Sequence, residues 1–215
     1  MTNPCSGMYL YGNTISICGN IGCGKSTLIK KLKAIPIRDE PIAIFEEPIG
    51  SWKEWLRCFY TNPAKYALGF QMKILLSFRS MIESIQSPTL ITERSPFESV
   101  NIFSRMMLEN GTLSQMDFDL IQETFEQIGW QTDLYIYIRT DPKICIERIK
   151  QRGRDCENDI DEQYVYDLHN QYEKIMGNEQ NINVVYVDGN VDPEQVEQFV
   201  RTRITEYVKE MMQKF

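Results

Sequence analysis

The sequence predicts one α/β domain built on a parallel five-stranded sheet with helices on both faces, and three observations support this prediction. Five short runs are rich in β-branched, aliphatic and aromatic residues, as buried strands are, and longer helical stretches separate them. Several of these stretches begin at clear helix-start signals. A glycine-rich segment joins the first run to the first helix. The runs cover residues 14–18, 42–45, 89–92, 134–138 and 184–187.

Length, composition and charge limit the classes of function. The 215 residues are 42% hydrophobic and 25% charged, which is typical of a globular domain with a sizeable core, and no repeat or linker divides them. We therefore expect a single domain over residues 1–215. The net charge of −7 argues against a polynucleotide partner, because nucleic-acid phosphates select basic surfaces. A small anionic ligand in a locally basic pocket is compatible with this charge.

The cysteines and the N-terminal residues bear on the compartment. The six cysteines are scattered and form no C-x-x-C pair, as in proteins of reducing compartments. Residues 1–11 lack the charged and apolar regions of a secretory signal and the arginines of a transit peptide. No apolar run is long enough to span a membrane. We expect a cytoplasmic protein without a membrane partner.

The segment between the first predicted strand and the first predicted helix fits the pattern G-x-x-x-x-G-K-[ST]. It reads Gly19, Asn20, Ile21, Gly22, Cys23, Gly24, Lys25, Ser26 and Thr27. The glycines let backbone N–H groups converge on an anion, and the helix N-terminus adds positive charge. Lys25 would reach the β- and γ-phosphates, and the Ser26 hydroxyl would ligate Mg²⁺. The pattern predicts the P-loop NTPase fold, and alone it suits a GTPase, an ATPase or a kinase.

Capping residues mark the predicted helix starts. Two serines have a glutamate three residues later, which is the capping-box pattern, and two aspartates precede a proline at the first helical position. These pairs are Ser51 with Glu54, Ser95 with Glu98, Asp141 with Pro142 and Asp192 with Pro193. The longest helix is predicted over residues 63–86.

Two acidic residues, Glu46 and Glu47, follow the second predicted strand. Ligands of open parallel sheets bind outside the carboxyl ends of the strands, which is where these residues lie. Pro48 keeps Glu47 extended, so its carboxylate can point into the cleft and accept a proton from an attacking hydroxyl. We interpret Glu46 as a solvated loop residue and Glu47 as a candidate general base.

A second charged pair, Glu93 and Arg94, follows the third predicted strand. In the usual sheet order of this fold these residues emerge beside the phosphate loop. Glu93 would support the Mg²⁺ shell, and Arg94 would neutralise charge on the transferring phosphoryl group. An ordinary surface ion pair between the two is the alternative.

Gln71 interrupts the apolar face of the helix predicted over residues 63–86, where it lies between Ala67 and Ile74. A buried amide without a partner costs about 1–3 kcal/mol, so this side chain needs one. The partner is either a neighbouring backbone group or a planar ligand whose adjacent donor and acceptor atoms match the amide. Both interpretations stay open at this stage.

The most basic stretch of the chain follows the fourth predicted strand. Arg148 and Arg152 are four residues apart and share a helix face, and Arg154 follows beyond Gly153. A polar loop comes next. We interpret this stretch as a mobile lid that closes its arginines over a triphosphate, with a solvated helix face as the alternative.

Taken in order, these segments resemble the deoxynucleoside kinase family, P-loop kinases that phosphorylate deoxyribonucleosides at the 5′-hydroxyl. The resemblance runs from the phosphate loop to about residue 176. Its markers are G-N-I-G-C-G-K-S-T, E-P-I with a tryptophan four residues after the proline, Y-x-x-P, F-Q, E-R-S and R-I-K-Q-R-G-R.

The resemblance implies substrates, a cofactor and roles for individual residues. It implies ATP as phosphoryl donor, Mg²⁺, a deoxynucleoside acceptor and a homodimer formed through helices beside the sheet. Glu47 would be the general base, Arg94 its companion near the 5′-hydroxyl, and Glu93 the carboxylate that supports Mg²⁺. The other implied roles are Tyr60 and Glu173 on the sugar 3′-hydroxyl, Gln71 on the base edge, Phe103 stacked on the base, Trp52 and Phe70 as pocket walls, and Arg148, Arg152 and Arg154 in the lid.

Two further positions bear on base preference. Members of the family that prefer deoxycytidine or purines carry an arginine and an aspartate, which align with Phe78 and Ser99 here. The missing charged pair resembles the thymidine-accepting, broader pyrimidine branch, although Phe78 is bulkier than that branch implies. A glutamine amide presents donor or acceptor to either thymine or cytosine by flipping. We expect thymidine and deoxycytidine as preferred substrates.

Two other functions stay open. A nucleoside-monophosphate kinase, such as a thymidylate kinase, would share the fold but needs an additional basic group for the phosphate of its substrate. A non-catalytic relative that serves as a subunit of an assembly would be expected to have lost Lys25, Glu47 or the lid arginines. All of them are present in this chain.

Overall fold

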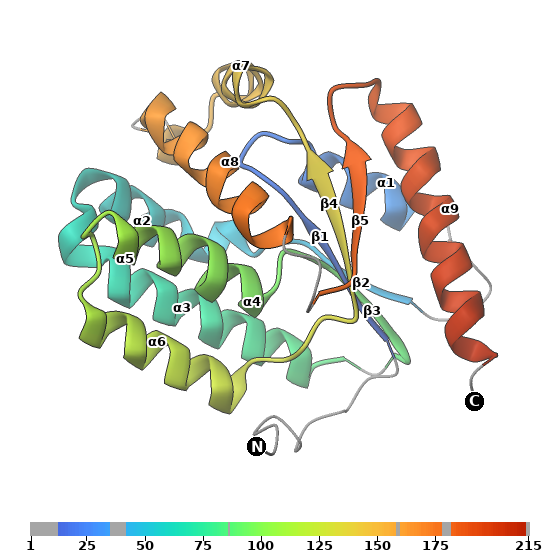
Figure 1. Cartoon of the computed structure of the whole chain (residues 1–215), viewed down its shortest axis with the longest axis horizontal. Helices are drawn as coiled ribbons and strands as arrows, with labels where there is room; N and C mark the ends of the chain where they lie inside the picture. Colours follow the sequence, from blue (N-terminus) through green and yellow to red (C-terminus); the bar gives the residue numbers. More distant parts are fainter. Residues whose placement is uncertain (1–12, 35–41, 86, 158–159, 178–181, 214–215) are drawn as a thin grey trace.

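A parallel sheet forms the centre of the protein. The computed structural model describes residues 13–34, 42–85, 87–157, 160–177 and 182–213 (Figure 1). The strands are β1 (Asn13–Cys18), β2 (Ile42–Phe45), β3 (Thr89–Glu93), β4 (Leu134–Arg139) and β5 (Val184–Asp188). They pair in the order β2-β3-β1-β4-β5, and every pair is parallel. The predicted sheet is confirmed, and four of its strands are one residue longer than expected.

Strand order brings the candidate site residues together. Every residue of β1 and β3 is buried, because both strands lie inside the sheet with helices over both faces. Ile17 of β1 lies opposite Glu93 of β3, and Thr92 of β3 lies opposite Phe45 at the end of β2. The carboxyl ends of these three strands therefore meet at one edge, as expected for a ligand site in a parallel sheet.

Helices cover both faces of the sheet (Figure 1). On one side lie α1 (Lys25–Ala34) and α9 (Pro193–Met212), and on the other α3 (Pro63–Glu83), α6 (Gln115–Ile128) and α8 (Glu162–Met176). The remaining segments are α2 (Ile49–Thr61), α4 (Pro96–Glu98), the π-helical η1 (Ser99–Ser104), α5 (Arg105–Glu109), α7 (Pro142–Arg152) and the 3-10 turn η2 (Asp155–Glu157). Aliphatic residues fill the core under α1 and α9, whereas aromatic residues dominate the core around α2, α3 and α6.

The longest predicted helix ends earlier than expected. It covers Pro63–Glu83, and residue 86 of the predicted range lies outside the described residues. The Asn62 side chain caps it by accepting a hydrogen bond from the backbone N–H of Lys65 at 3.3 Å. No helix within the described ranges is both long and apolar enough to cross a membrane.

Two of the predicted helix starts are confirmed by hydrogen bonds, and a third is wrong. The side chains of Asp141 and Asp192 each accept a bond from the backbone N–H two residues further on. The start predicted at Ser51 is wrong, because α2 already begins at Ile49. The Ser51 hydroxyl lies inside the first turn and donates to the Pro48 carbonyl at 2.8 Å.

The helix start predicted at Ser95 is confirmed, but the capping box predicted there does not form. A helix does begin at Pro96, but the Ser95 side chain makes no capping bond to it. Glu98 turns into the interior, where its carboxylate accepts the Ser16 hydroxyl at 2.9 Å. The backbone that follows, Ser99–Ser104, is π-helical. Such departures from regular helix are common at functional sites.

Candidate active site

The phosphate loop between β1 and α1 has the backbone conformation that its glycines permit. Gly19 and Gly22 have φ angles of +141° and +81°, which residues with a side chain rarely adopt. A Cβ atom at Gly22 would clash with the Cys145 carbonyl oxygen of α7. The Asn20 side chain donates to the Val165 carbonyl of α8 at 2.9 Å. The loop is therefore held against α7 and α8 in its anion-binding curve.

Lys25 and Ser26 lie where the loop becomes helix α1. Lys25 is 5% exposed, and its Nζ donates to the carbonyl oxygens of Gly19 at 3.0 Å and Asn20 at 2.8 Å. The Ser26 Oγ donates to Glu93 Oε1 at 2.6 Å. The fold thus brings the two predicted Mg²⁺ ligands together, and hydroxyl and carboxylate oxygens are ligand types that this ion accepts.

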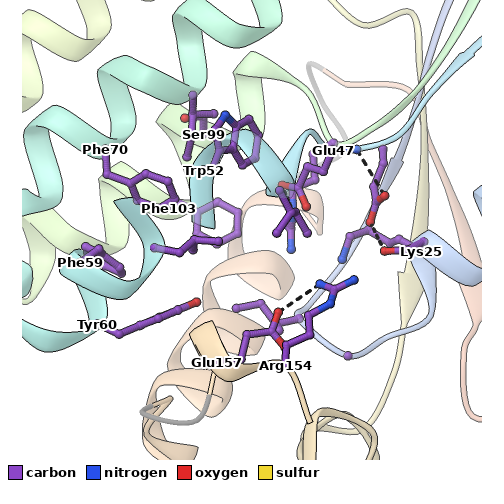
Figure 2. A pocket seen from close by; sticks show the side chains of 18 of the residues that line it. Lys25, Glu47, Trp52, Phe59, Tyr60, Phe70, Ser99, Phe103, Arg154 and Glu157 are labelled. Carbon is purple, nitrogen blue, oxygen red and sulfur yellow. Dashed lines mark hydrogen bonds and ion pairs between the residues drawn. The ribbon is translucent and has the colours of Figure 1, made fainter. Parts of the chain in front are cut away.

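One cavity of about 460 Å³ extends from the phosphate loop into an aromatic pocket (Figure 2). Sites for small molecules commonly measure about 300–1,000 Å³. The predicted site residues that line it are Ile21, Gly22, Gly24, Lys25, Ser26, Thr27, Glu47, Trp52, Tyr60, Phe70, Gln71, Phe78, Glu93, Arg94, Ser99, Phe103, Arg148, Arg152 and Arg154. Gly19, Asn20 and Cys23 belong to the loop without lining the cavity. The predicted donor and acceptor halves therefore share one space.

Glu47 lies between these two halves. Its Oε1 accepts a bond from Arg94 Nε at 2.9 Å, and its backbone N–H donates to Glu93 Oε2 at 3.4 Å. Burial raises the pKa of Glu47 from 4.5 to about 7, while the Arg94 guanidinium opposes this rise and the Glu93 carboxylate adds to it. A carboxylate whose pKa lies near the working pH is suited to general base catalysis.

The raised pKa of Glu47 predicts a pH dependence of activity and stability. We expect kcat/KM to increase as the pH rises through about 7, because only the ionised carboxylate accepts a proton. The folded state binds the Glu47 proton more tightly than the unfolded state does, so the protonated carboxyl adds to the free energy of unfolding. This contribution is fully present below pH 4.5 and is lost as the pH rises through about 7. The charged groups that face it are Arg94, Glu93, Lys25 and Glu98.

Glu47→Gln checks both effects. This variant should lose the acidic limb of the kcat/KM profile, and its melting temperature relative to the wild type should be higher at about pH 8 than at about pH 5. If the kcat/KM profile of Glu47→Gln still fell at acidic pH, the group that titrates near pH 7 would not be Glu47.

Arg94 connects the phosphate loop, the candidate base and an aromatic wall. Its φ angle is +63°, a left-handed conformation that is uncommon outside glycine. Its Nη1 donates to the Gly19 carbonyl at 3.1 Å and to the Tyr172 hydroxyl, while Nε faces Glu47. The guanidinium carbon lies 4.7 Å from the centre of the Phe103 ring. Arg94 is 6% exposed and its partners come from other elements, so the alternative of an ordinary surface pair is excluded.

Aromatic side chains and one amide form the far end of the cavity. Trp52 meets Phe70 and Phe78 edge-on, with ring centroids 6.4 and 6.2 Å apart. Gln71 is 1% exposed, and its Oε1 accepts the Ser99 hydroxyl at 2.6 Å. The partner of the buried amide is therefore a side chain of η1 and not a neighbouring backbone group. An amide edge between aromatic rings suits a planar ligand that forms hydrogen bonds.

The predicted lid consists of the end of α7, a left-handed glycine and the turn η2. Helix α7 ends at Arg152 and is capped by Gly153, whose φ angle is +57°. Arg148, Arg152 and Arg154 all line the cavity. Arg152 and Arg154 both pair with Glu157 of η2, the latter at 3.2 Å (Figure 2).

The structure does not bring Glu173 to this cavity, which corrects the predicted pairing with Tyr60. The Glu173 carboxylate accepts the Tyr137 hydroxyl at 2.8 Å and pairs with Arg139 Nη2 at 2.7 Å. These bonds hold it against β4. Tyr60, by contrast, lines the cavity from α2 (Figure 2).

Glu157 and Tyr164 are cavity residues that sequence reasoning missed. The Glu157 side chain is 7% exposed and faces the same part of the cavity as Tyr60 (Figure 2). The Tyr164 ring packs edge-on against Tyr60, with centroids 6.3 Å apart. The sequence feature that could have pointed to Glu157 is the acidic polar loop after Arg154. This loop contains several carboxylates, and the sequence does not show which of them reaches the cavity.

Comparisons with known proteins find relatives over most of the chain. A family model for deoxynucleoside kinases matches residues 15–213. A protein of Invertebrate iridescent virus 6 that carries the name kinase protein 143R is 34% identical over 196 residues, which cover 90% of this chain and 97% of that protein. The deoxyadenosine kinase of Dictyostelium discoideum is 32% identical over 205 residues, which cover 89% of this chain and 79% of that enzyme.

A solved structure supports the fold. The deoxyadenosine kinase from M. mycoides, with the products dCMP and a flexible dCDP bound, matches 90% of this chain and 98% of its own with a TM-score of 0.76 at 24% identity. The family match extends over nearly the whole chain, and both relatives match over most of their own length. This chain therefore belongs to the deoxynucleoside kinase family.

Proposed function

We propose that this protein transfers the γ-phosphoryl group of ATP to the 5′-hydroxyl of a deoxynucleoside, and that it prefers thymidine and deoxycytidine. One observation supports this most: a single cavity joins a phosphate-binding loop to an aromatic pocket with a buried amide edge. Glu47 lies at the junction, where an acceptor hydroxyl would meet the terminal phosphate.

The phosphate end of the cavity is suited to ATP. The loop and the N-terminus of α1 supply backbone N–H groups, and Lys25 adds a buried ammonium group. Arg148 also lies at this end, where its Nη1 donates to the Cys23 carbonyl of the loop at 3.4 Å, and Arg152 and Arg154 line the cavity from the lid. We propose that these groups hold the phosphates and spread the charge of the transferring group.

The start of α1 also suits Mg²⁺. The Ser26 hydroxyl oxygen and the Glu93 carboxylate oxygen lie 2.6 Å apart, and both line the cavity beside the loop. Mg²⁺ usually takes one or two protein oxygens and completes its shell with phosphates and water. We propose that these two residues hold the ion, which when bound neutralises charge on the phosphates.

The acceptor chemistry follows from the position of Glu47. Its carboxylate accepts the proton of the 5′-hydroxyl while the 5′-oxygen forms a bond to the γ-phosphorus. The bond from that phosphorus to the bridging oxygen breaks, and ADP leaves with the bonding electrons. Arg94 orients Glu47 through the 2.9 Å bond and neutralises charge on the transferring group.

The far end of the cavity supports a pyrimidine base. Phe78 is 2% exposed and meets Trp52 and Trp130 edge-on, with centroids 6.2 and 5.5 Å apart. Phe78 lines the cavity, and we propose that its ring occupies the space that the second ring of a purine would need. The Ser99 hydroxyl donates to Gln71 here and is equally able to accept, so the amide keeps its partner in either orientation. This supports recognition of both thymine and cytosine.

We propose that Tyr60 and Glu157 hold the sugar 3′-hydroxyl. Glu157→Gln should reduce kcat/KM for the deoxynucleoside by about 10- to 100-fold, because a hydrogen bond to a charged group contributes about 1.5–3 kcal/mol. Glu173→Gln is the matched control and should stay within about twofold of the wild type, because Glu173 faces β4. Steady-state kinetics with thymidine measures both, and a larger loss in Glu173→Gln would reverse the assignment.

Acceptor specificity distinguishes the proposal from a monophosphate kinase. The basic side chains that line the cavity are Lys25, Arg94, Arg148, Arg152 and Arg154. Each has a role at the donor end or beside Glu47, so none is assigned to a substrate phosphate. With ATP and Mg²⁺, thymidine should be phosphorylated and thymidine 5′-monophosphate should not; the reverse result would favour a thymidylate kinase.

Nucleotide binding tests the non-catalytic alternative. The residues that such a protein would be expected to lose, Lys25, Glu47 and the lid arginines, all line the cavity. Isothermal titration should therefore detect ATP binding. Its absence would support a role as an assembly subunit.

We also propose a homodimer through helices on the α3 and α6 side of the sheet. Leu76 of α3 and Met116 and Leu120 of α6 are exposed, and these two helices pack against each other. Exposed apolar side chains on adjacent helices would be removed from water if a second copy of the chain packed against them, which favours a dimer. Light scattering after size-exclusion chromatography should give twice the chain mass, and the mass of one chain would contradict the proposal.

A further inference from the structure

Glu98 is a buried carboxylate that the reaction described above does not use. It is 0% exposed and does not line the cavity. Its Oε2 accepts the Ser16 hydroxyl of β1 at 2.9 Å, and its Oε1 accepts the Tyr172 hydroxyl of α8 at 2.8 Å. Arg94 Nη1 lies 3.7 Å from Oε1. A carboxylate is costly to bury unless it is paired and hydrogen-bonded, so this arrangement points to a specific use.

Tyr172 connects Glu98 to Arg94. Its hydroxyl accepts a hydrogen bond from Arg94 Nη1 and donates one to Glu98. Because a phenol has a single proton, its donation to Glu98 leaves the oxygen free to accept from Arg94. The Tyr172 ring is itself fixed, since it stacks on Tyr137 with centroids 5.5 Å apart and meets Phe103 edge-on at 6.4 Å.

These contacts hold one edge of the Arg94 guanidinium. The residue has a φ angle of +63°, and an uncommon backbone conformation persists only where the surrounding contacts determine it. Nη1 is held by the Gly19 carbonyl, by the Tyr172 hydroxyl and by the charge of Glu98. Nε, on the opposite edge, is the atom that meets Glu47. A planar guanidinium cannot move one edge without moving the other.

We propose that Glu98 and Tyr172 are positioning residues for phosphoryl transfer: they fix the Nη1 edge of Arg94 so that its Nε stays directed at Glu47. Neither residue lines the cavity, so both act through Arg94. The inference rests on the proposed function, because it takes Arg94 and Glu47 as the groups that serve the acceptor hydroxyl.

Two conservative variants test the proposal. Glu98→Gln keeps the shape and removes the charge, and Tyr172→Phe keeps the ring and removes the bridging hydroxyl. Each should lower kcat by about 10- to 100-fold, which is the scale of loss from small misplacement of a catalytic group. KM for ATP should change by no more than about twofold, because the phosphate loop keeps its own contacts. The double variant should lose little more than the stronger single variant, because both act on one guanidinium.

Tyr137→Phe is the matched control. It removes the hydroxyl of the ring stacked on Tyr172, but that hydroxyl bonds to Glu173 and not to Arg94. Its kcat should stay within about twofold of the wild type. Melting temperatures establish that each variant is folded at the assay temperature.

Arg94→Ala separates failure of the inference from failure of the proposed function. If Arg94→Ala keeps wild-type kcat, the proposed role of Arg94 is wrong. If Arg94→Ala is impaired while Glu98→Gln and Tyr172→Phe melt at lower temperature with unchanged kcat, the two residues are structural and the inference alone is overturned. In the Arg94→Ala background, Glu98→Gln should change kcat by less than about twofold.

Discussion

Replacement of Glu47 by glutamine is expected to reduce kcat by about 10²- to 10⁴-fold, the usual contribution of a general base. The glutamine has the same shape and keeps an oxygen for the bond from Arg94 Nε. It cannot accept the proton of the 5′-hydroxyl. KM for ATP should change little, because Glu47 is not a member of the phosphate loop. Single-turnover kinetics with thymidine and ATP measures the loss at the chemical step.

The neighbouring glutamate is a matched control for this variant. Glu46 pairs with Lys33 on the protein surface, with Nζ and Oε1 3.0 Å apart and both side chains more than one-third exposed. Glu46→Gln should therefore stay within about twofold of the wild type in kcat. A Glu47→Gln enzyme with full kcat, or an equal loss in both variants, would rule out Glu47 as the base.

Replacement of Arg94 by alanine is expected to have the second large effect, on both rate and stability. Loss of one group that stabilises transition-state charge lowers kcat by about 10²- to 10³-fold. The change also leaves the carboxylates of Glu47 and Glu98 without their cationic partner. Removal of one member of a buried ion pair costs about 3–5 kcal/mol in the free energy of unfolding. Urea denaturation at about pH 8 measures this loss, because Glu47 is ionised there.

Two variants complete the Arg94 experiment. Arg94→Lys keeps the charge but cannot reach Glu47 and the Gly19 carbonyl at the same time, so it should recover stability more than kcat. Arg203→Ala removes an exposed arginine that pairs with Glu206 on α9, and its free energy of unfolding should change by no more than about 0.5 kcal/mol. If Arg94→Ala were as stable as Arg203→Ala, the ion-pair network around Arg94 would contribute nothing measurable.

Local sequence patterns predicted the fold and the position of the phosphate loop at one end of the cavity. The phosphate loop is one continuous segment, and its glycines occupy positions that require positive φ angles. Glu47 and Glu93 follow strands directly, so their placement needed only the order of the sheet. The resemblance placed Gln71 and Phe103 in the pocket, where the structure has them.

Contacts between distant segments were not predictable from local patterns. Ser99 bonds to Gln71 across 28 residues, and Tyr172 bonds to Glu98 across 74. The Glu98 spacing fitted a capping box, but tertiary contacts inside the core took its carboxylate away from the helix end. The Glu157 turn has no periodicity, and it follows a left-handed glycine that caps α7 and redirects the chain.

Steady-state kcat/KM with the four deoxynucleosides, ATP and Mg²⁺ tests the central claim most directly. Thymidine and deoxycytidine should both yield 5′-monophosphates with kcat/KM at least about tenfold above the purine deoxynucleosides, because in the proposed base pocket Phe78 leaves no space for a second ring. A preference for deoxyadenosine or deoxyguanosine would contradict the proposed base pocket. If none of the four were phosphorylated, the proposed reaction itself would be wrong.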